Sequence, residues 1–218
     1  MLYGYIEQNY AQNEPIFISD LVNSGLKIEK VRNEVKSLTD DGKLKRYDTG
    51  IYYIPKKTIF NVEATPSRDL IIEKKFLKDE QGSIGYISGI LFANQLGLTT
   101  QVPVVYEVVS NKATRALRKV SIGNATVLLR KPRVPVMEEN YKVLQLLDLI
   151  MDIDFASELK GNELKEKLLA FMRNAKITVS MLREYTAYYP DKIYKNMYEA
   201  GVLDYVSAWE QKWFFRSY

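Results

Sequence analysis

The stretch that decides the fold is residues 19–55, which read SDLVNSGLKIEKVRNEVKSLTDDGKLKRYDTGIYYIP. Ser19 is a good N-cap for a short helix over Asp20 to Asn23, and Gly25 ends that helix. A longer amphipathic helix is predicted over Lys27 to Asp41, because apolar side chains recur there at helical spacing. These apolar residues are Ile28, Val31, Val35 and Leu38.

A pair of β-strands follows the longer helix. Leu44 to Tyr47 and Ile51 to Ile54 are β-type runs, and the turn Asp48-Thr49-Gly50 between them ends on a glycine, which suits a positive φ. Near the start of the chain, Leu2 to Tyr10 has the apolar spacing of a helix. Helix, short helix, longer helix and hairpin is the order of a winged helix-turn-helix, which we predict for residues 1–62.

The predicted winged helix-turn-helix carries side chains that suit DNA. Because successive helical residues are turned by about 100°, Asn33 lies nearly opposite the apolar face, with Lys30 and Lys36 beside it. Asn, Lys and Arg bond phosphates and purine edges. The residues predicted to bind double-stranded DNA are Lys27, Lys30, Arg32, Asn33, Lys36, Lys43, Lys45 and Arg46, with Lys56 and Lys57 after the hairpin.

A protein-docking role is the alternative for this segment, since winged helices also serve as docking modules. Residues 1–65 contain nine Lys or Arg and nine Asp or Glu. Such a neutral balance is unusual for a protein that binds DNA tightly. Salt-dependent binding to random duplex DNA would separate the two roles.

The rest of the chain predicts an α+β protein with a second domain over residues 66–218. Its first part, 66–136, mixes helices and strands, its second part, 137–218, is helical, and residues 61–67 are the predicted linker. Helices are predicted over Arg68–Lys78, Gly85–Leu96, Lys112–Val120, Asn140–Asp152, Asn162–Asn174, Val179–Ala187, Asp191–Ala200 and from Ser207 onward. Strands are predicted over Val104–Val109 and Ala125–Lys131.

Basic residues gather in the middle of the chain. Residues 66–136 contain eleven Lys or Arg against five Asp or Glu, and no acidic residue occurs from Val108 to Met137. We expect one continuous basic surface here, with Arg115, Arg118 and Lys119 on one helix face. Such a surface suits binding to a phosphate backbone or to an acidic or RNA-bound target. The alternative is a surface that contacts only solvent. The members of the expected basic surface are Lys112, Arg115, Arg118, Lys119, Arg130, Lys131 and Arg133.

The composition argues against catalysis. The chain has no cysteine and no histidine, which excludes Cys/His zinc sites, thiol chemistry and imidazole proton transfer. Asp148, Asp152 and Asp154 are the densest carboxylates near an apolar helix, and we interpret them as helix-surface charge rather than a Mg²⁺ site. We expect a protein that is not an enzyme and that uses no cofactor or metal.

Neither a membrane span nor an export signal is expected. No apolar run reaches the roughly 18 residues needed to cross a bilayer, and the opening MLYGYIEQNY lacks the layout of a signal peptide. A cytoplasmic protein is therefore predicted. The C-terminal part is rich in aromatic residues, which their helical spacing assigns to the core more readily than to an interface. They are Tyr185, Tyr188, Tyr189, Tyr194, Tyr198, Tyr205, Trp209, Trp213, Phe214 and Phe215.

The middle segment resembles a known family. SIGYISGILFANQLGLTTQVPVVYEVVSN at residues 83–111, followed by ATVLLRKPR at residues 125–133, resembles the AbiEi antitoxins of type IV toxin–antitoxin (abortive infection) systems. The most specific block is LTTQVP, and the winged helix stands in the expected position. The resemblance covers roughly residues 1–136 and fades through the helical C-terminus.

The resemblance implies a function in two parts. Antitoxins of this kind repress their own operon by binding promoter repeats through the N-terminal domain. The remaining domain neutralises a nucleotidyltransferase-like toxin encoded next door, without a stable complex between the two proteins. A stand-alone relative without a toxin would keep only the regulatory part.

Overall fold

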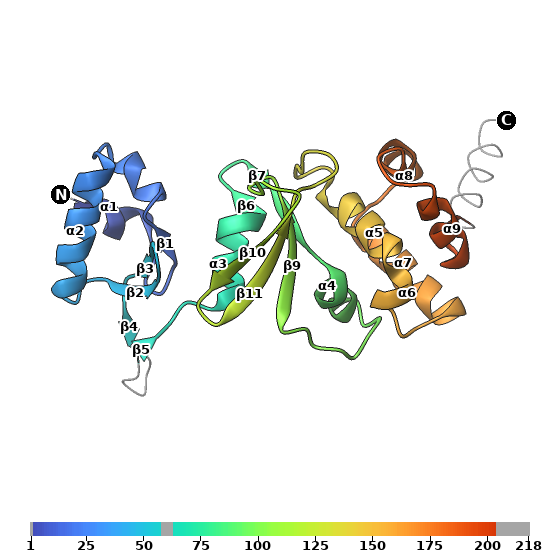
Figure 1. The fold of residues 1–218 in the computed structure, drawn as a ribbon, viewed down its shortest axis with the longest axis horizontal. Helices are drawn as coiled ribbons and strands as arrows, with labels where there is room; N and C mark the ends of the chain where they lie inside the picture. Colours follow the sequence, from blue (N-terminus) through green and yellow to red (C-terminus); the bar gives the residue numbers. More distant parts are fainter. Residues whose placement is uncertain (1, 58–62, 204–218) are drawn as a thin grey trace. The chain divides into compact units, whose positions relative to one another are not determined.

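The structure is a computed structural model that describes residues 2–57 and 63–203, and the chain divides into two compact units (Figure 1). The first unit runs to Lys75 and also includes Ile122–Asn124, and the second holds the rest. The division thus comes after the predicted linker at residues 61–67. The first unit therefore includes the antiparallel pair of β4 (Lys56–Lys57) and β5 (Glu63–Ala64).

The first unit has the element order of a winged helix-turn-helix, as the sequence predicts. Its three-stranded sheet has the order β1-β3-β2, with antiparallel pairing throughout. Figure 1 shows the helices of this unit packed against each other and beside these strands. In chain order the elements are α1 (Leu2–Asn9), β1 (Ile16–Phe17), the 3-10 helix η1 (Asp20–Ser24), α2 (Ile28–Asp40), β2 (Lys45–Asp48) and β3 (Ile51–Tyr53).

Glycines make the two turns that shape this unit. Gly25 has φ 80° and its N–H donates to the carbonyl of Val22 over 3.1 Å, which ends η1. Gly50 has φ 73° in the turn between β2 and β3. The apolar face predicted for α2 is buried, apart from the half-buried Ile28. The core consists of Leu2, Ile6, Ile16, Leu21, Val31, Val35, Leu38, Leu44 and Ile54.

A helical segment joins the units along the chain. The helix α3 (Arg68–Ile72) runs on into the π-helical η2 (Glu73–Leu77), so the helix predicted over 68–78 is confirmed in position. The Ser67 hydroxyl caps α3 by accepting from the backbone N–H of Leu70 at 3.2 Å. A small hairpin of β6 (Lys78–Asp79) and β7 (Gly82–Ser83) follows.

A mixed four-stranded sheet organises the second unit. Its order is β10-β11-β9-β8, where β9 and β11 are parallel and β8 and β9 antiparallel. The strands β10 and β11 are neighbours joined by a two-residue turn, a length that only an antiparallel hairpin allows. The strands are β8 (Gly85–Ser88), β9 (Val105–Ser110), β10 (Leu117–Ile122) and β11 (Ala125–Arg130).

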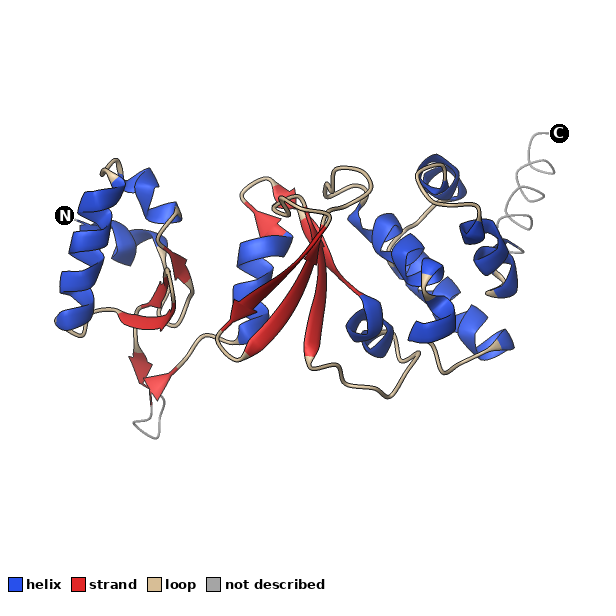
Figure 2. Ribbon diagram, viewed as in Figure 1, coloured by secondary structure: helices blue, strands red, loops and turns tan. Residues whose placement is uncertain are grey.

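The helices from residue 89 onward lie on one side of this sheet (Figure 2). The predicted C-terminal helices are confirmed up to α9, whereas the segment from Ser207 lies outside the described residues. Within residues 2–57 and 63–203, none of the helices combines the length and the apolar character of a membrane span. The helices are α4 (Gly89–Gln95), α5 (Tyr141–Met151), α6 (Ile153–Ala156), α7 (Gly161–Asn174), α8 (Val179–Thr186) and α9 (Lys192–Glu199).

The aromatic residues of the C-terminal part divide between core and surface. Tyr189 is buried and Tyr185 is half-buried, but Tyr188, Tyr194 and Tyr198 are exposed. The core assignment from helical spacing is therefore wrong for these three, because short helices that pack on one side leave the opposite side to water. The remaining aromatic residues of the prediction, from Tyr205 to Phe215, lie outside the described residues.

Two helix predictions are wrong where strand pairing decides the local structure. Lys112–Val120 is a turn followed by β10, in which Leu117, Lys119 and Ser121 are exposed and alternate with more buried residues. The segment predicted as one helix from Gly85 to Leu96 begins as β8 and turns into α4 at Gly89, where φ is 63°. Local composition in both places is overruled by pairing with neighbouring strands.

Gly85 shows why β8 needs a glycine at its start. A Cβ at this position would lie 2.3 Å from the carbonyl oxygen of Phe76 and 2.6 Å from that of Val109. Both atoms belong to the backbone, so no side-chain rotation relieves the contact. The glycine therefore permits the close approach of three chain segments.

Candidate nucleic-acid interface

The outward face of α2 is polar and open to solvent. Lys30, Asn33 and Lys36 are exposed, as the helical geometry predicts, and so are Glu29, Arg32 and Ser37. Lys27, at the N-cap position, is exposed as well. The structure thus places the predicted α2 residues together along one side of one helix, with the acidic Asp40 and Asp41 at its far end.

A hydrogen bond between helices fixes the orientation of α2. The Glu34 carboxylate accepts from the backbone N–H of Leu2 at 3.1 Å, and Glu34 is half-buried. Val31 and Val35 flank it with fully buried side chains. Because packing holds the inner side of α2 in place, Asn33 and its basic neighbours are presented on a rigid support.

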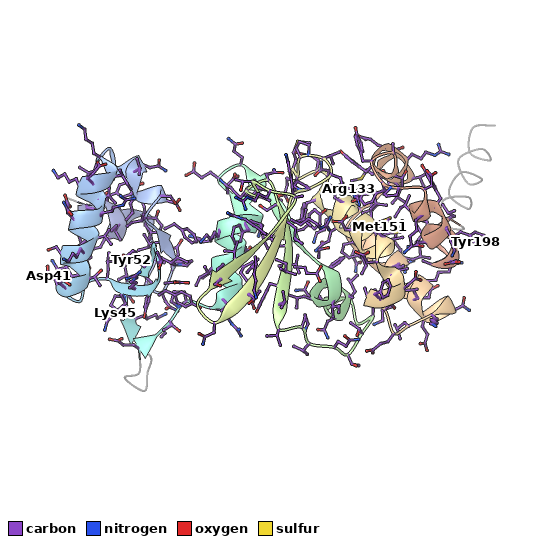
Figure 3. All side chains as sticks on the ribbon, in the orientation of Figure 1. Asp41, Lys45, Tyr52, Arg133, Met151 and Tyr198 are labelled. Carbon is purple, nitrogen blue, oxygen red and sulfur yellow. The ribbon has the colours of Figure 1, made fainter. Side chains whose placement is uncertain are left out.

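The hairpin of β2 and β3 supplies the wing, and two of its basic side chains are held by neighbours. Arg46 donates from Nε to the carbonyl of Asp48 at 3.3 Å and from Nη2 to the hydroxyl of Thr49 at 3.1 Å. Lys45 Nζ lies 3.3 Å from the Glu63 carboxylate of β5, and both side chains are partly exposed. Figure 3 shows Lys45 on this hairpin, with Tyr52 on the neighbouring strand.

Lys43 lies two residues before β2. Its ammonium group lies 5.0 Å from the ring centroid of Tyr3, on α1. Lys56 is exposed on β4. The predicted DNA-binding set therefore consists of a group on one face of α2, two wing residues, and Lys43, which contacts Tyr3 of α1.

The predicted basic residues of the middle segment do not lie on a helix. Arg115 is exposed in the turn before β10 and Lys119 faces outward from β10, whereas Arg118 is half-buried, so the predicted shared helix face is wrong. Lys112 and Lys131 are exposed. Arg130 and Arg133 engage other side chains instead of facing water alone.

A buried polar network joins the sheet to the helices. Asp148 of α5 accepts from Arg130 Nη2 at 2.6 Å and from the Tyr86 hydroxyl at 2.8 Å. Tyr86 and Arg130 each pair with Val109 in the register of the sheet, so their side chains lie in one row across three strands. The Tyr189 hydroxyl donates to the carbonyl of Leu144 at 3.3 Å and belongs to the same group.

Burial and charge set the protonation of this network. Burial raises the pKa of the Tyr86 phenol well above its usual range, and the nearby Asp148 charge raises it further. The pKa of Tyr189 is raised by burial first and by Asp148 second. Burial alone would lower the pKa of Arg130, but the attraction of Asp148 outweighs it and the pKa is raised. Both phenols stay neutral and the guanidinium stays charged at neutral pH.

Asp148 is 3% exposed, so the interpretation of this residue as helix-surface charge is wrong. The α5 helix is covered on nearly every side, and its carboxylate is tolerated because it is paired. A lone carboxylate in the apolar run YKVLQLLDLIM was the available sequence signal. Asp152 and Asp154 are exposed. Among the described residues, no cluster of three or more acidic side chains could hold a metal ion.

A known protein family matches this chain. No curated protein matches this sequence. A family model, described as a family of unknown function (DUF6088), matches residues 7–167, which run from α1 through the sheet into α7. This match covers most of the chain, including the α2 face and, from the buried network, Tyr86, Arg130 and Asp148. The chain belongs to the DUF6088 family.

Proposed function

We propose that this chain is a DNA-binding transcriptional autorepressor and an antitoxin. Its first unit binds double-stranded DNA at its own promoter. Its second unit serves to neutralise a neighbouring nucleotidyltransferase-like toxin, without a stable complex between them. The observation that carries the DNA-binding part is the exposed face of α2, with Lys30, Asn33 and Lys36, beside a basic wing. The antitoxin part rests on the resemblance of residues 83–133 to the AbiEi antitoxins.

The chemistry of the α2 face suits the major groove. The groove admits one α-helix, and an Asn side chain can bond an adenine edge through its amide in a bidentate way. Lys30 and Lys36 flank Asn33 and are suited to phosphates on either side. Arg46 is held by its own turn and would approach the phosphate backbone with little loss of side-chain freedom.

The salt dependence of binding tests the phosphate contacts. We expect the Lys45→Ala/Arg46→Ala variant to bind every duplex more weakly and to flatten the plot of log affinity against log salt by about 0.9 for each lost contact. The matched control is Lys167→Ala/Arg173→Ala, which removes two exposed charges from α7. Equal effects in both variants, or none in either, would contradict the wing assignment.

Sequence preference tests the base contact. Asn33→Ala should cost about 1–3 kcal/mol at a preferred site selected from random duplexes and little elsewhere. Ser37→Ala removes a polar group one helical turn further along the same face and serves as the control. If Asn33→Ala binds all duplexes as the wild type does, Asn33 reads no base.

A protein-docking module is the second candidate, and the charge balance of the first unit favours it. Glu29 interrupts the basic face of α2, and residues 1–65 carry as many acids as bases. Lack of any salt-dependent duplex binding by the full chain would favour this role. A stand-alone regulator is distinguished by its gene neighbourhood, where no nucleotidyltransferase-like reading frame would lie beside it.

A further inference from the structure

Two arginines converge on Tyr189 where the sheet meets the helices. Arg130 is the last residue of β11, and Arg133 follows three residues later in the loop. The guanidinium carbon of Arg133 lies 4.7 Å from the ring centroid of Tyr189. Arg130 reaches the same tyrosine from the sheet side through Asp148, and both cations act on the Tyr189 phenol. Figure 3 shows Arg133 on the loop beside the start of α5.

The Arg133 guanidinium is held in one orientation, but the structure shows no acceptor for its N–H donors among the described residues. Stacking on an aromatic ring uses the flat face of the guanidinium, whereas its N–H donors lie in the plane at the edge. Within the described part of the chain, no oxygen accepts a hydrogen bond from this side chain, which is exposed. Its donors are therefore directed outward and are held in place by Tyr189, which is itself 7% exposed.

The Arg130 guanidinium is also held in one orientation, and only its Nη2 donates to Asp148. Its Nη2 bonds Asp148, which is almost fully buried, while 32% of the Arg130 side chain is exposed. No nitrogen of Arg130 is buried without a hydrogen-bond partner. The N–H groups that do not bond Asp148 therefore reach solvent. Asp148 thus fixes the guanidinium from within and leaves its outer edge available.

The charges do not balance at this place. Arg130 and Arg133 carry two positive charges, and the one negative charge of Asp148 is buried and already bonded to Arg130. A carboxylate carries one charge, whereas a phosphate monoester carries about −1.5 to −2 at neutral pH and so matches two guanidinium groups better. Its three terminal oxygens also suit two planar guanidinium forks.

We propose that Arg130 and Arg133, supported by Asp148 and Tyr189, form a binding site for a terminal phosphate group. The ligand class is a phosphate monoester, either on a free nucleotide or at the end of a nucleic-acid strand. A duplex backbone is a poorer fit, because each diester carries one charge and offers only two unbridged oxygens. This site lies within the second unit and does not depend on operator binding by the first.

Calorimetry and ³¹P NMR on the full chain test the site, with AMP, inorganic phosphate and acetate as probes. We expect saturable one-to-one binding of a phosphate probe and none of acetate. Arg133→Gln should weaken that binding by about tenfold or more, because charge-assisted hydrogen bonds are lost. Arg133→Lys keeps the charge but loses the fork, so its binding should fall between the two. Arg173→Gln, an exposed arginine of α7, is the matched control and should bind as the wild type does.

The source of the phosphate is distinguished by a single-stranded oligonucleotide with and without a 5′-phosphate. A preference for the phosphorylated strand over AMP assigns the site to strand ends, and the reverse assigns it to free nucleotides. Equal binding of the two strands, with no binding of AMP, would overturn the proposal. So would equal weakening by Arg133→Gln and Arg173→Gln, or the lack of saturable binding of any phosphate probe. Because Arg133 is exposed, the thermal unfolding of Arg133→Gln should match the wild type.

Discussion

Arg130 Nη2 lies 2.6 Å from Asp148 Oδ2, and this contact joins the end of β11 to α5. We expect Asp148→Ala to lower the free energy of unfolding of the second unit by about 3 kcal/mol, because it leaves the Tyr86 hydroxyl and part of Arg130 without their buried acceptor. Asp152→Ala removes an exposed carboxylate one turn later and should change stability by less than about 0.5 kcal/mol. Urea unfolding measures both, and equal midpoints would show that the pair contributes no net stability.

The backbone approach at Gly85 predicts a strong effect of a single methyl group. Gly85→Ala should destabilise the second unit by about 1–3 kcal/mol or more, since a Cβ would meet two carbonyl oxygens. Gly4→Ala, in α1, places its methyl group in open space and should stabilise the first unit by about 0.5–1 kcal/mol. Opposite signs in thermal or urea unfolding are expected. If Gly85→Ala leaves the stability of the second unit unchanged, β8 shifts readily to make room for the methyl group.

Glu63 holds a wing lysine that the proposed function assigns to DNA. Its carboxylate pairs with Lys45 at 3.3 Å and would repel a phosphate placed there. Glu63→Gln should therefore tighten duplex binding by about two- to fivefold, the range of an exposed ion pair. Glu80→Gln, an exposed acid of the second unit, is the control. Unchanged or weaker binding of Glu63→Gln, measured by fluorescence anisotropy, would remove Lys45 from the interface.

Glu158, two residues after α6, bonds Thr99 and Thr100 of the LTTQVP block. We expect the stability of this contact to depend on acid. The Glu158 carboxylate accepts from the backbone N–H of Thr100 at 3.0 Å and from the Thr99 hydroxyl at 2.8 Å. These hydrogen bonds, the one from Thr100 foremost, lower the pKa of Glu158 from its ordinary value of 4.5.

The sign of the pH effect follows from that lowered pKa. The stabilisation is complete above the ordinary value and is lost as the pH falls through the lowered pKa. Glu158→Gln should therefore be less stable than the wild type at neutral pH, and the difference should shrink on acidification. Amide exchange at Thr100 should speed up in the variant. Glu163→Gln, an exposed acid of α7, should show neither effect, and a constant difference across the pH range would exclude Glu158 as the acid-sensitive group.

If the proposed function holds, repression and neutralisation should be separable. A fragment that begins at Thr65 keeps the whole second unit, including Phe76, whose carbonyl accepts from the Ser110 hydroxyl at 2.5 Å. We expect this fragment to fold and to rescue cells that express the neighbouring toxin, but to leave the promoter active. A well-folded fragment that fails to rescue would place part of the antitoxin activity in residues 1–64. Circular dichroism confirms folding before the rescue assay.

The local sequence alone determined the winged helix-turn-helix. The period of Ile28, Val31, Val35 and Leu38 sets the buried side of α2, and this places Asn33 on the opposite side without knowledge of any other element. Gly25 and Gly50 mark turns through their positive φ. These features depend on near neighbours in the chain, so a pattern of a few residues contains them. The C-terminal helices up to α9 followed from the same periodicity.

Only the tertiary structure decided the basic middle segment and the buried network. Lys112 to Val120 has helical composition, but pairing with β11 makes Leu117–Ile122 a strand, so Arg115, Arg118 and Lys119 share no helix face. Asp148 has the helical spacing of a surface charge, yet Tyr86 and Arg130 approach it from strands 62 and 18 residues away. Strand pairing and the pairing of buried charge both depend on partners distant in sequence. Local propensity contains no information about such partners, and their contacts outweigh it.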